Sequence, residues 1–233
     1  MYTLANVRRV SVVALPLLLV AALVAGCGGG STSSSSSSTT PAGLLHPETL
    51  NKKAPQIFDI TFHTTKGDFV VTVHRTWAPN GADRVYNLAK AHFFDGVEFF
   101  RVVPNFVVQF GISPDPAVSK AFLNATIPDD PVTQRNTRGT VSYAAAGPNT
   151  RTTQLFVNLG DNSNLDASGF APLGSVTSGM NVVDKLYSGY GDDPTSHQGE
   201  MQTLGNAWLA ENYPKLDRIK SAEITKEENP ALP

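Results

Sequence analysis

Two segments combine a charged donor with many apolar residues in a pattern that could bind a peptide. Residues 94–111 read FDGVEFFRVVPNFVVQFG, and residues 139–157 read GTVSYAAAGPNTRTTQLFV. The first segment contains Arg101, whose guanidinium is always charged and offers five N–H donors in a rigid fork. Such a fork can stabilise a group that becomes an acceptor only in a transition state. A lone arginine, by contrast, is more often part of a surface ion pair.

The sequence has few residues suited to thiol chemistry, metal binding or nucleic-acid binding. Cys27 is the only cysteine, so the chain has no Cys-x-x-Cys pair, and none of its five histidines has the spacing of a metal pair on a helix. We therefore expect no metal site and no cofactor. The formal charge of −2 becomes −4 if Arg8 and Arg9 are cleaved off, as argued below. A weakly acidic chain without a basic stripe is not expected to bind nucleic acid.

The two segments resemble the central signatures of the cyclophilin-type peptidyl-prolyl cis-trans isomerases. The first matches an Asp-Gly turn, a strand ending in Phe-x-Arg, and Pro-x-Phe-x-x-Gln-x-Gly; the second matches Ala-Gly-Pro-Asn-Thr followed by Gln-x-Phe. Residues 165–176 resemble the next turn and strand, and the similarity extends in the same order from Ile57 to Ile224. The resemblance implies an enzyme without cofactor that rotates X-Pro peptide bonds, with proline-containing peptide segments of exported proteins as its partners.

The resemblance also implies a role for individual residues. Arg101 matches the catalytic arginine, and Gln109 matches the glutamine that orients it. The remaining matches form an apolar slot for the substrate proline, a backbone contact surface and a rim, and they are Phe106, Val107, Ala144, Ala145, Gln154, Phe156, Leu165 and Phe170.

Several positions depart from the common family pattern. Val107 replaces a methionine, and Ala145 replaces an asparagine that binds through its backbone. Asn164 stands where many members carry tryptophan, and Phe170 falls near the position of the family's histidine. These changes put binding of cyclosporin in doubt, but they do not affect Arg101.

Hydrophobic alternation predicts a mainly β fold. Residues 58–63 and 69–73 alternate with period two around a tight turn at 65–68, as in a hairpin. Helices are expected from an N-cap at Asn80, with Ala82, Val85, Tyr86 and Ala89 on one face, and near 179–187. Further strands are expected at 97–103, 106–110, 139–144, 153–158, 173–176 and 218–225. Periodicity alone does not separate a barrel from a sandwich; the family resemblance favours a closed eight-stranded antiparallel β-barrel capped by two α-helices.

The first 52 residues predict export and anchoring. Arg8 and Arg9 precede an apolar run at 10–24, which is typical of a signal peptide over residues 1–26. Cys27 follows Val-Ala-Gly in a pattern that resembles the bacterial lipobox, although an ordinary signal peptide with an incidental cysteine is the alternative. Residues 27–52, rich in Gly, Ser and Thr, predict an acylated cysteine and a flexible tether.

The chain is thus predicted to be an exported lipoprotein held on the extracytoplasmic side of a membrane by Cys27. The export route, Sec or twin-arginine, stays open. We expect residues 53–227 to form the cyclophilin-like domain and residues 228–233 to form a tail. The expected partners are proline-containing segments of exported proteins and, through Cys27, the membrane. A monomer is expected.

A polar stretch at 191–214 is expected to form a loop or short-helix insertion, with Met201, Leu204, Trp208 and Leu209 on its buried face. We interpret it as a surface insertion that packs on the barrel, with a partner-binding helix as the alternative.

Two other functions are alternatives to isomerisation for the whole domain. One is a non-catalytic module that holds proline-containing segments, and the other is a solute-binding or structural lipoprotein.

Overall fold

The computed structural model describes residues 41–229. The predicted signal peptide 1–26, the predicted lipid-attachment residue Cys27 and most of the tether lie outside the described residues. Within them, no helix is long and apolar enough to cross a membrane. Over the same residues, no group of three or more His, Cys, Asp or Glu side chains could hold a metal ion.

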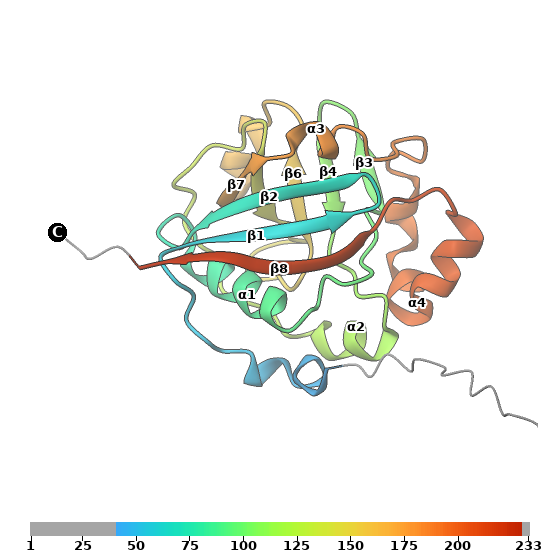
Figure 1. The fold of residues 1–233 in the computed structure, drawn as a ribbon, viewed down its shortest axis with the longest axis horizontal. Coiled ribbons are helices and arrows are strands. Elements are labelled where there is room, and N and C mark those ends of the chain that lie inside the picture. The colour runs from blue at the N-terminus through green and yellow to red at the C-terminus, as the bar shows by residue number, and fades with distance from the viewer. Residues whose placement is uncertain (1–40, 230–233) are drawn as a thin grey trace, which may run out of the picture. The chain divides into compact units, whose positions relative to one another are not determined.

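Eight antiparallel strands form one strongly curled sheet in the order β3-β4-β6-β5-β7-β2-β1-β8 (Figure 1). The prediction of a mainly β, eight-stranded fold is confirmed. The strands are β1 (Ile57–Thr64), β2 (Gly67–His74), β3 (Arg101–Val103), β4 (Val107–Phe110), β5 (Thr140–Tyr143), β6 (Leu155–Asn158), β7 (Pro172–Ser178) and β8 (Ile219–Glu228).

The predicted hairpin of β1 and β2 carries a large share of the core. Phe58, Ile60 and Phe62 of β1 are buried, and Phe62 pairs in register with Phe69 of β2. Their rings stack with centroids 4.9 Å apart. Period-two alternation thus places one face of each strand in the interior, as the sequence indicates.

The two edges of the sheet meet along a short seam. The predicted strand 97–103 is divided: only Arg101–Val103 pair with β4, while the residues before them bond to the start of β8. The amide of Gly96 donates to the carbonyl of Ile219 at 2.9 Å, and the amide of Ile219 donates to that of Val97 at 2.8 Å. An isolated bridge between Glu98 and Arg218 belongs to the same seam. These bonds, not a continuous ladder, close the barrel.

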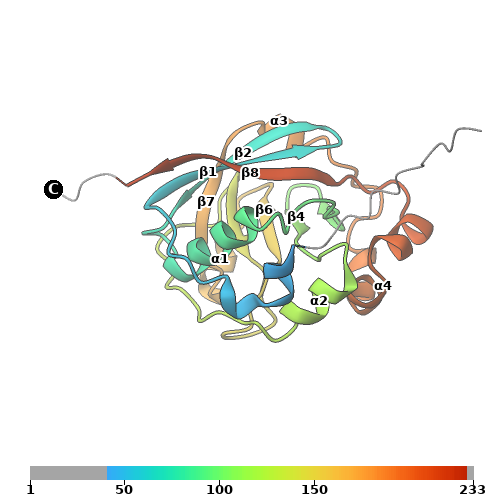
Figure 2. The ribbon, with the colours of Figure 1, turned by 60° about the horizontal axis from the view of Figure 1, so that its bottom comes forward.

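The described residues contain four α-helices, where two and a possible short helix in the insertion were expected: α1 (Pro79–Lys90), α2 (Pro116–Phe122), α3 (Met180–Val183) and α4 (Gln198–Asn212). α1 lies against β8 and β7 (Figure 2). Its predicted apolar face is buried. The helix expected at 179–187 is regular only over α3, since the chain beyond it turns so that the amide of Tyr187 donates to Asp217.

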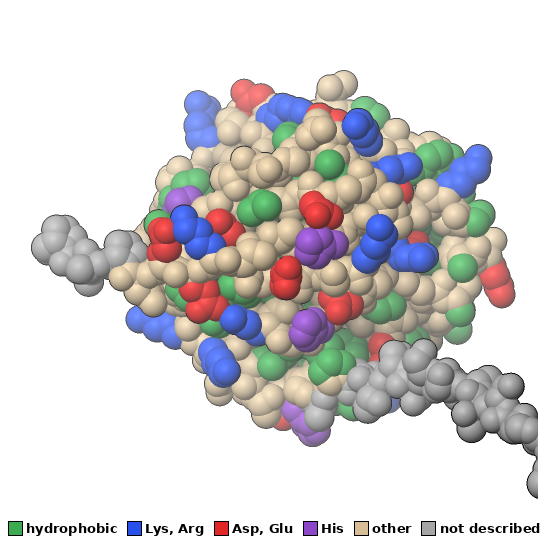
Figure 3. Space-filling view, viewed as in Figure 1, with side chains coloured by type: hydrophobic (Ala, Val, Ile, Leu, Met, Phe, Trp, Pro, Cys, Tyr) green, Lys and Arg blue, Asp and Glu red, His purple; other side chains and the backbone are tan. Residues whose placement is uncertain are grey.

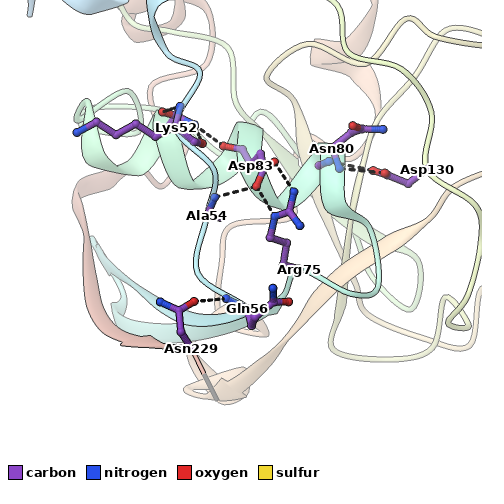
Figure 4. A network of polar contacts seen from close by, with 10 residues as sticks. Lys52, Ala54, Gln56, Arg75, Asn80, Asp83, Asp130 and Asn229 are labelled. Atoms are coloured by element: carbon purple, nitrogen blue, oxygen red, sulfur yellow. Dashed lines mark hydrogen bonds and ion pairs between the residues drawn. The ribbon is translucent and has the colours of Figure 1, made fainter. Parts of the chain in front are cut away.

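Asn80 is not the N-cap of α1, which begins one residue earlier at Pro79. The proline carries no amide hydrogen, so it fits the first helical position, where none is needed. The next two amides, of Asn80 and Gly81, donate instead to the carboxylate of Asp130, each at 2.9 Å. Figure 4 shows Asn80 beside Asp130. A carboxylate from a distant loop therefore caps the helix.

Residues 41–52, which we predicted as part of the tether, lie against the domain. They form two short 3₁₀ turns, Ala42–Leu45 and Pro47–Thr49, and Leu44 is buried. The amide of Lys52 donates to Asn87 at 3.1 Å, and the side chain of Asn87 donates back to the Lys52 carbonyl at 2.7 Å. At the other end, Glu228 belongs to β8, beyond the predicted end of the domain.

The predicted insertion contains a longer helix than expected, together with the 3₁₀ turn Asp193–His197. Gly205 adopts φ 66°, so α4 is kinked, and one helical face does not run through it. Met201 and Leu209 are buried in a small cluster with Phe100, whereas Leu204 is 53% exposed. The prediction that Leu204 is buried is wrong because the kink removes it from that face.

The face of the molecule in Figure 3 carries acidic and basic side chains interspersed.

Glu98 lies on the seam between the two edges of the sheet. Burial raises the pKa of its carboxyl to about 7, against the smaller opposing effect of Arg218. Because the folded state binds this proton more tightly than the unfolded state, the contribution of Glu98 to stability is present at low pH and is lost as the pH rises from about 4.5 through 7.

We therefore predict that Glu98→Gln raises the free energy of unfolding at pH 8 by about 1–2 kcal/mol, a figure reduced because the carboxyl is partly exposed. At pH 4 the substitution should change stability little. Urea unfolding at both pH values measures this, with the exposed Glu211→Gln as control. A wild-type advantage that grows with pH would contradict it.

Candidate functional site

A cavity of about 290 Å³ opens on the face where β3, β4 and β6 adjoin the insertion. Nine of the ten groove residues predicted from the sequence line it: Arg101, Phe106, Val107, Gln109, Ala144, Ala145, Phe156, Leu165 and Phe170. Thr195 and Gln198 of the insertion complete the lining. The tenth predicted residue, Gln154, lines a smaller neighbouring cavity of about 110 Å³ and is hydrogen-bonded to Gln109.

Strand pairing sets the position of Arg101. Arg101 is the first residue of β3 and lies opposite Gln109 of β4, which in turn lies opposite Phe156 of β6. Directly paired residues in an antiparallel sheet project to the same face. One row across three strands therefore brings the arginine, the glutamine and an aromatic ring to the same opening.

The guanidinium of Arg101 is held from several sides. Its Nη1 donates to Oε1 of Gln109 at 3.2 Å, and its Nε donates to Oδ1 of Asp192 at 2.5 Å. It also lies 5.2 Å from the centre of the Phe106 ring, within the range of a cation–π contact. The side chain is only 25% exposed. The arginine is thus fixed at the edge of the cavity and still reaches solvent.

Three glutamines continue from Arg101 as a directed chain of hydrogen bonds. Gln109 Nε2 donates to Gln154 Oε1 at 2.8 Å, and Gln154 Nε2 donates to Gln198 Oε1 at 2.9 Å. Because Arg101 can only donate, it fixes the orientation of the Gln109 amide, and that amide fixes the next. The order of the chain runs from β3 through β4 and the segment before β6 to α4.

Aromatic and aliphatic side chains line much of the rest of the cavity. The rings of Phe156 and Phe170 meet edge to face with centroids 5.7 Å apart. Val107 and Phe156 are almost fully buried, while Phe106 and Leu165 are partly exposed to the cavity. A slot with apolar walls and a few polar groups at one edge is the usual form of a site for a small apolar group. A proline ring is such a group.

Sequence reasoning missed Asp192, Thr195 and Gln198. The stretch 191–214 was expected to pack on the barrel as a surface insertion, yet its first residues reach the site. The sequence of a polar loop does not show whether an acidic side chain faces solvent or forms an ion pair with an arginine 91 residues away, as Asp192 does. The departure noted at Asn164 does not contribute to the cavity: the residue is exposed and outside its lining.

Comparison with known proteins settles the family. Residues 58–206 match the profile described as "Cyclophilin type peptidyl-prolyl cis-trans isomerase/CLD". The chain belongs to the cyclophilin-type peptidyl-prolyl cis-trans isomerase family. It is accordingly an isomerase that acts on proline-containing peptides, as the two sequence signatures indicate.

Relatives of this cyclophilin are found in bacteria and eukaryotes. A peptidyl-prolyl cis-trans isomerase of Acinetobacter baylyi is 33% identical over 62% of this chain and 78% of its own. Peptidyl-prolyl cis-trans isomerase B of Escherichia coli is 30% identical over 54% and 82%. A solved cyclophilin-type isomerase of Cryptosporidium parvum shares the fold, with a TM-score of 0.54, 16% identity, and coverage of 74% of this chain and 99% of that one.

We predict that this cyclophilin binds cyclosporin weakly. Asn164 lacks the indole N–H and the apolar ring face of the tryptophan that the family pattern leads us to expect at this position. Asn164→Trp should tighten binding by about tenfold, which corresponds to one aromatic contact with its hydrogen bond. Titration of both proteins by calorimetry measures the difference. Nanomolar binding by the unmodified protein would contradict the prediction.

Proposed function

We propose that this cyclophilin isomerises X-Pro bonds in exported proteins, with Arg101 as the catalytic residue and the apolar slot as the binding site for proline. The observation that carries the proposal is the placement of a fixed, partly exposed guanidinium at the edge of a cavity that is lined in large part by apolar side chains. We expect the domain to act as a monomer.

The chemistry needs a donor and no nucleophile. Resonance gives the peptide bond partial double-bond character and a rotation barrier of about 18–20 kcal/mol. Halfway through the rotation that resonance is lost, and the proline nitrogen becomes pyramidal with an available lone pair. A donor aimed at this nitrogen binds the twisted state better than either planar state, and this difference lowers the barrier.

The side chains around Arg101 suit this role. The guanidinium donates one N–H to Gln109 and one to Asp192. Of the five donors of an arginine, three are left to meet a peptide in the cavity. Phe156, Phe170 and Leu165 would hold the proline ring while the backbone of Ala144 and Ala145 aligns the peptide. Binding energy would then come mainly from the slot, and rate from Arg101.

We predict that Arg101→Ala lowers kcat/KM for a short X-Pro peptide by one to two orders of magnitude or more. A single charge-assisted contact made mainly in the transition state is worth roughly 2–4 kcal/mol. Arg101→Lys should restore little, because a flexible ammonium does not reproduce the fork. An isomerisation assay measures the rate, and peptide titration measures affinity, which should fall less than the rate.

The apolar slot provides the matching comparison. Phe156→Ala should weaken peptide binding more than Arg101→Ala does, because it removes a wall of the proline site. Circular dichroism and thermal unfolding establish that each variant is folded. Full turnover by folded Arg101→Ala would replace this mechanism with the alternative of a peptide-binding module without catalysis by Arg101.

The location of the enzyme is part of the same proposal. The apolar run at 10–24, the lipobox-like sequence before Cys27 and the Ser-rich stretch after it support export followed by lipid attachment. A single acyl chain gives only marginal membrane binding, so a stable anchor implies several chains on this cysteine. From there the domain would assist folding of other exported proteins on the extracytoplasmic side.

We predict that Cys27→Ser releases or misprocesses the protein while the isomerase domain remains folded. Fractionation of cells expressing either form measures membrane association, and mass spectrometry of the mature N-terminus measures acylation. Substitution of the nearby Ser31 by Ala is the control and should leave the anchor intact. An unmodified Cys27 in the mature protein would contradict the proposal without affecting the isomerase activity.

A further inference from the structure

The insertion brings a carboxylate to the proposed catalytic arginine, and no other acidic side chain forms a salt bridge with Arg101 among the described residues. We propose that Asp192 is a positioning residue for isomerisation, which fixes the orientation of the Arg101 guanidinium before substrate binds. This inference rests on the proposed catalytic role of Arg101. It adds a function for the insertion, which the family signatures do not contain.

The hydrogen bonds around Arg101 fit a role for Asp192 in orienting the guanidinium. Gln109 accepts from Nη1, and Asp192 accepts from Nε on another side of the same planar group. One acceptor leaves a planar fork free to rotate about the bond it makes, whereas two acceptors at separate nitrogens define its plane. Phe106 lies over the group at 5.2 Å and limits movement out of that plane. The N–H groups that remain are therefore directed before the peptide arrives.

Asp192 is itself held in place by its surroundings. The hydroxyl of Thr195 donates to the Asp192 carbonyl at 2.6 Å, which stabilises the turn. The next residue, Asp193, accepts from the hydroxyl of Tyr213 at 2.7 Å, and its amide donates to the Tyr190 carbonyl at 3.1 Å. Burial, followed by the bond to Asp193, raises the pKa of Tyr213 to about 12, so this hydroxyl remains a neutral donor at physiological pH.

A separate core fixes the insertion to the barrel. Tyr213 packs with Met201, Leu209, Phe100 and Ile112, and its ring meets that of Tyr190 edge to face with centroids 5.0 Å apart. Phe100 directly precedes Arg101 in the chain. The apolar cluster therefore fixes the distance between the loop that carries Asp192 and the strand that carries Arg101.

The insertion also contacts the other end of the polar chain. Gln198, the first residue of α4, accepts from Gln154, which accepts from Gln109. Arg101 is thereby restrained directly through Asp192 and indirectly through three amides. A residue that orients a catalytic group typically changes the rate by about 10–100-fold when it is lost.

Asp192→Ala should lower kcat about tenfold with little change in peptide affinity. Asp192→Asn keeps an oxygen that can accept from Nε and removes the charge, so it should recover most of the lost rate. Exchange NMR on a proline peptide at saturating concentration measures kcat, and titration measures affinity. Asp184→Ala is the matched control, because Asp184 also pairs with an arginine, Arg138 at 2.7 Å, and is outside the cavity lining.

A double-mutant cycle separates positioning from a general loss of structure. If Asp192 acts through Arg101, adding Asp192→Ala to Arg101→Ala should cause no further loss of rate. An equal loss in both backgrounds would overturn the inference, as would unchanged kcat in folded Asp192→Ala or an Asn variant as slow as the Ala variant. If Arg101→Ala alone keeps full turnover, the proposed catalytic role of Arg101 is wrong. That result differs from one in which Arg101→Ala is slow and Asp192→Ala is not, which would overturn only the role of Asp192.

Discussion

The antiparallel pairing of β3, β4 and β6 in a single register is the constraint on which the site depends. It aligns Arg101, Gln109 and Phe156 across three neighbouring strands, so that a charged fork, its acceptor and an apolar wall reach the same opening. A slip of one residue would send alternate side chains to the other face and separate these groups. Register is secured by the buried side: Val108 and Val157, paired between β4 and β6, are fully buried.

Closure of the sheet fixes where this row of residues ends. The segment before β3 bonds to the start of β8, while β3 itself bonds to β4, so one short stretch of chain serves both the seam and the site. Glu98 belongs to the seam and Arg101 begins the strand three residues later. The position of the guanidinium is therefore tied to the closure of the barrel, and the partial burial of Glu98 is a consequence of that closure.

One part of the insertion attaches it to the barrel, and another part contributes side chains to the cavity. Its apolar cluster around Tyr213 and Met201 attaches it to the barrel, and its polar side chains extend from that attachment to the cavity. The acidic side chain of Asp192 also offsets the charge of Arg101 at an opening with several apolar walls. A cation close to apolar walls is costly unless it is paired, and here the pairing leaves part of the fork free to bind peptide.

The sequence by itself determined the strand hairpin, the family and most of the cavity lining, because these follow from local alternation and from two uninterrupted motifs around Arg101 and Phe156. Tertiary structure decided the rest. Asp130 caps α1 from a distant loop, the kink at Gly205 exposes Leu204, and Asp192 meets Arg101 across 91 residues. The two carboxylate contacts join segments far apart in the chain, and the backbone at Gly205 packs closely against Pro114, so no local pattern of residue types encodes these features.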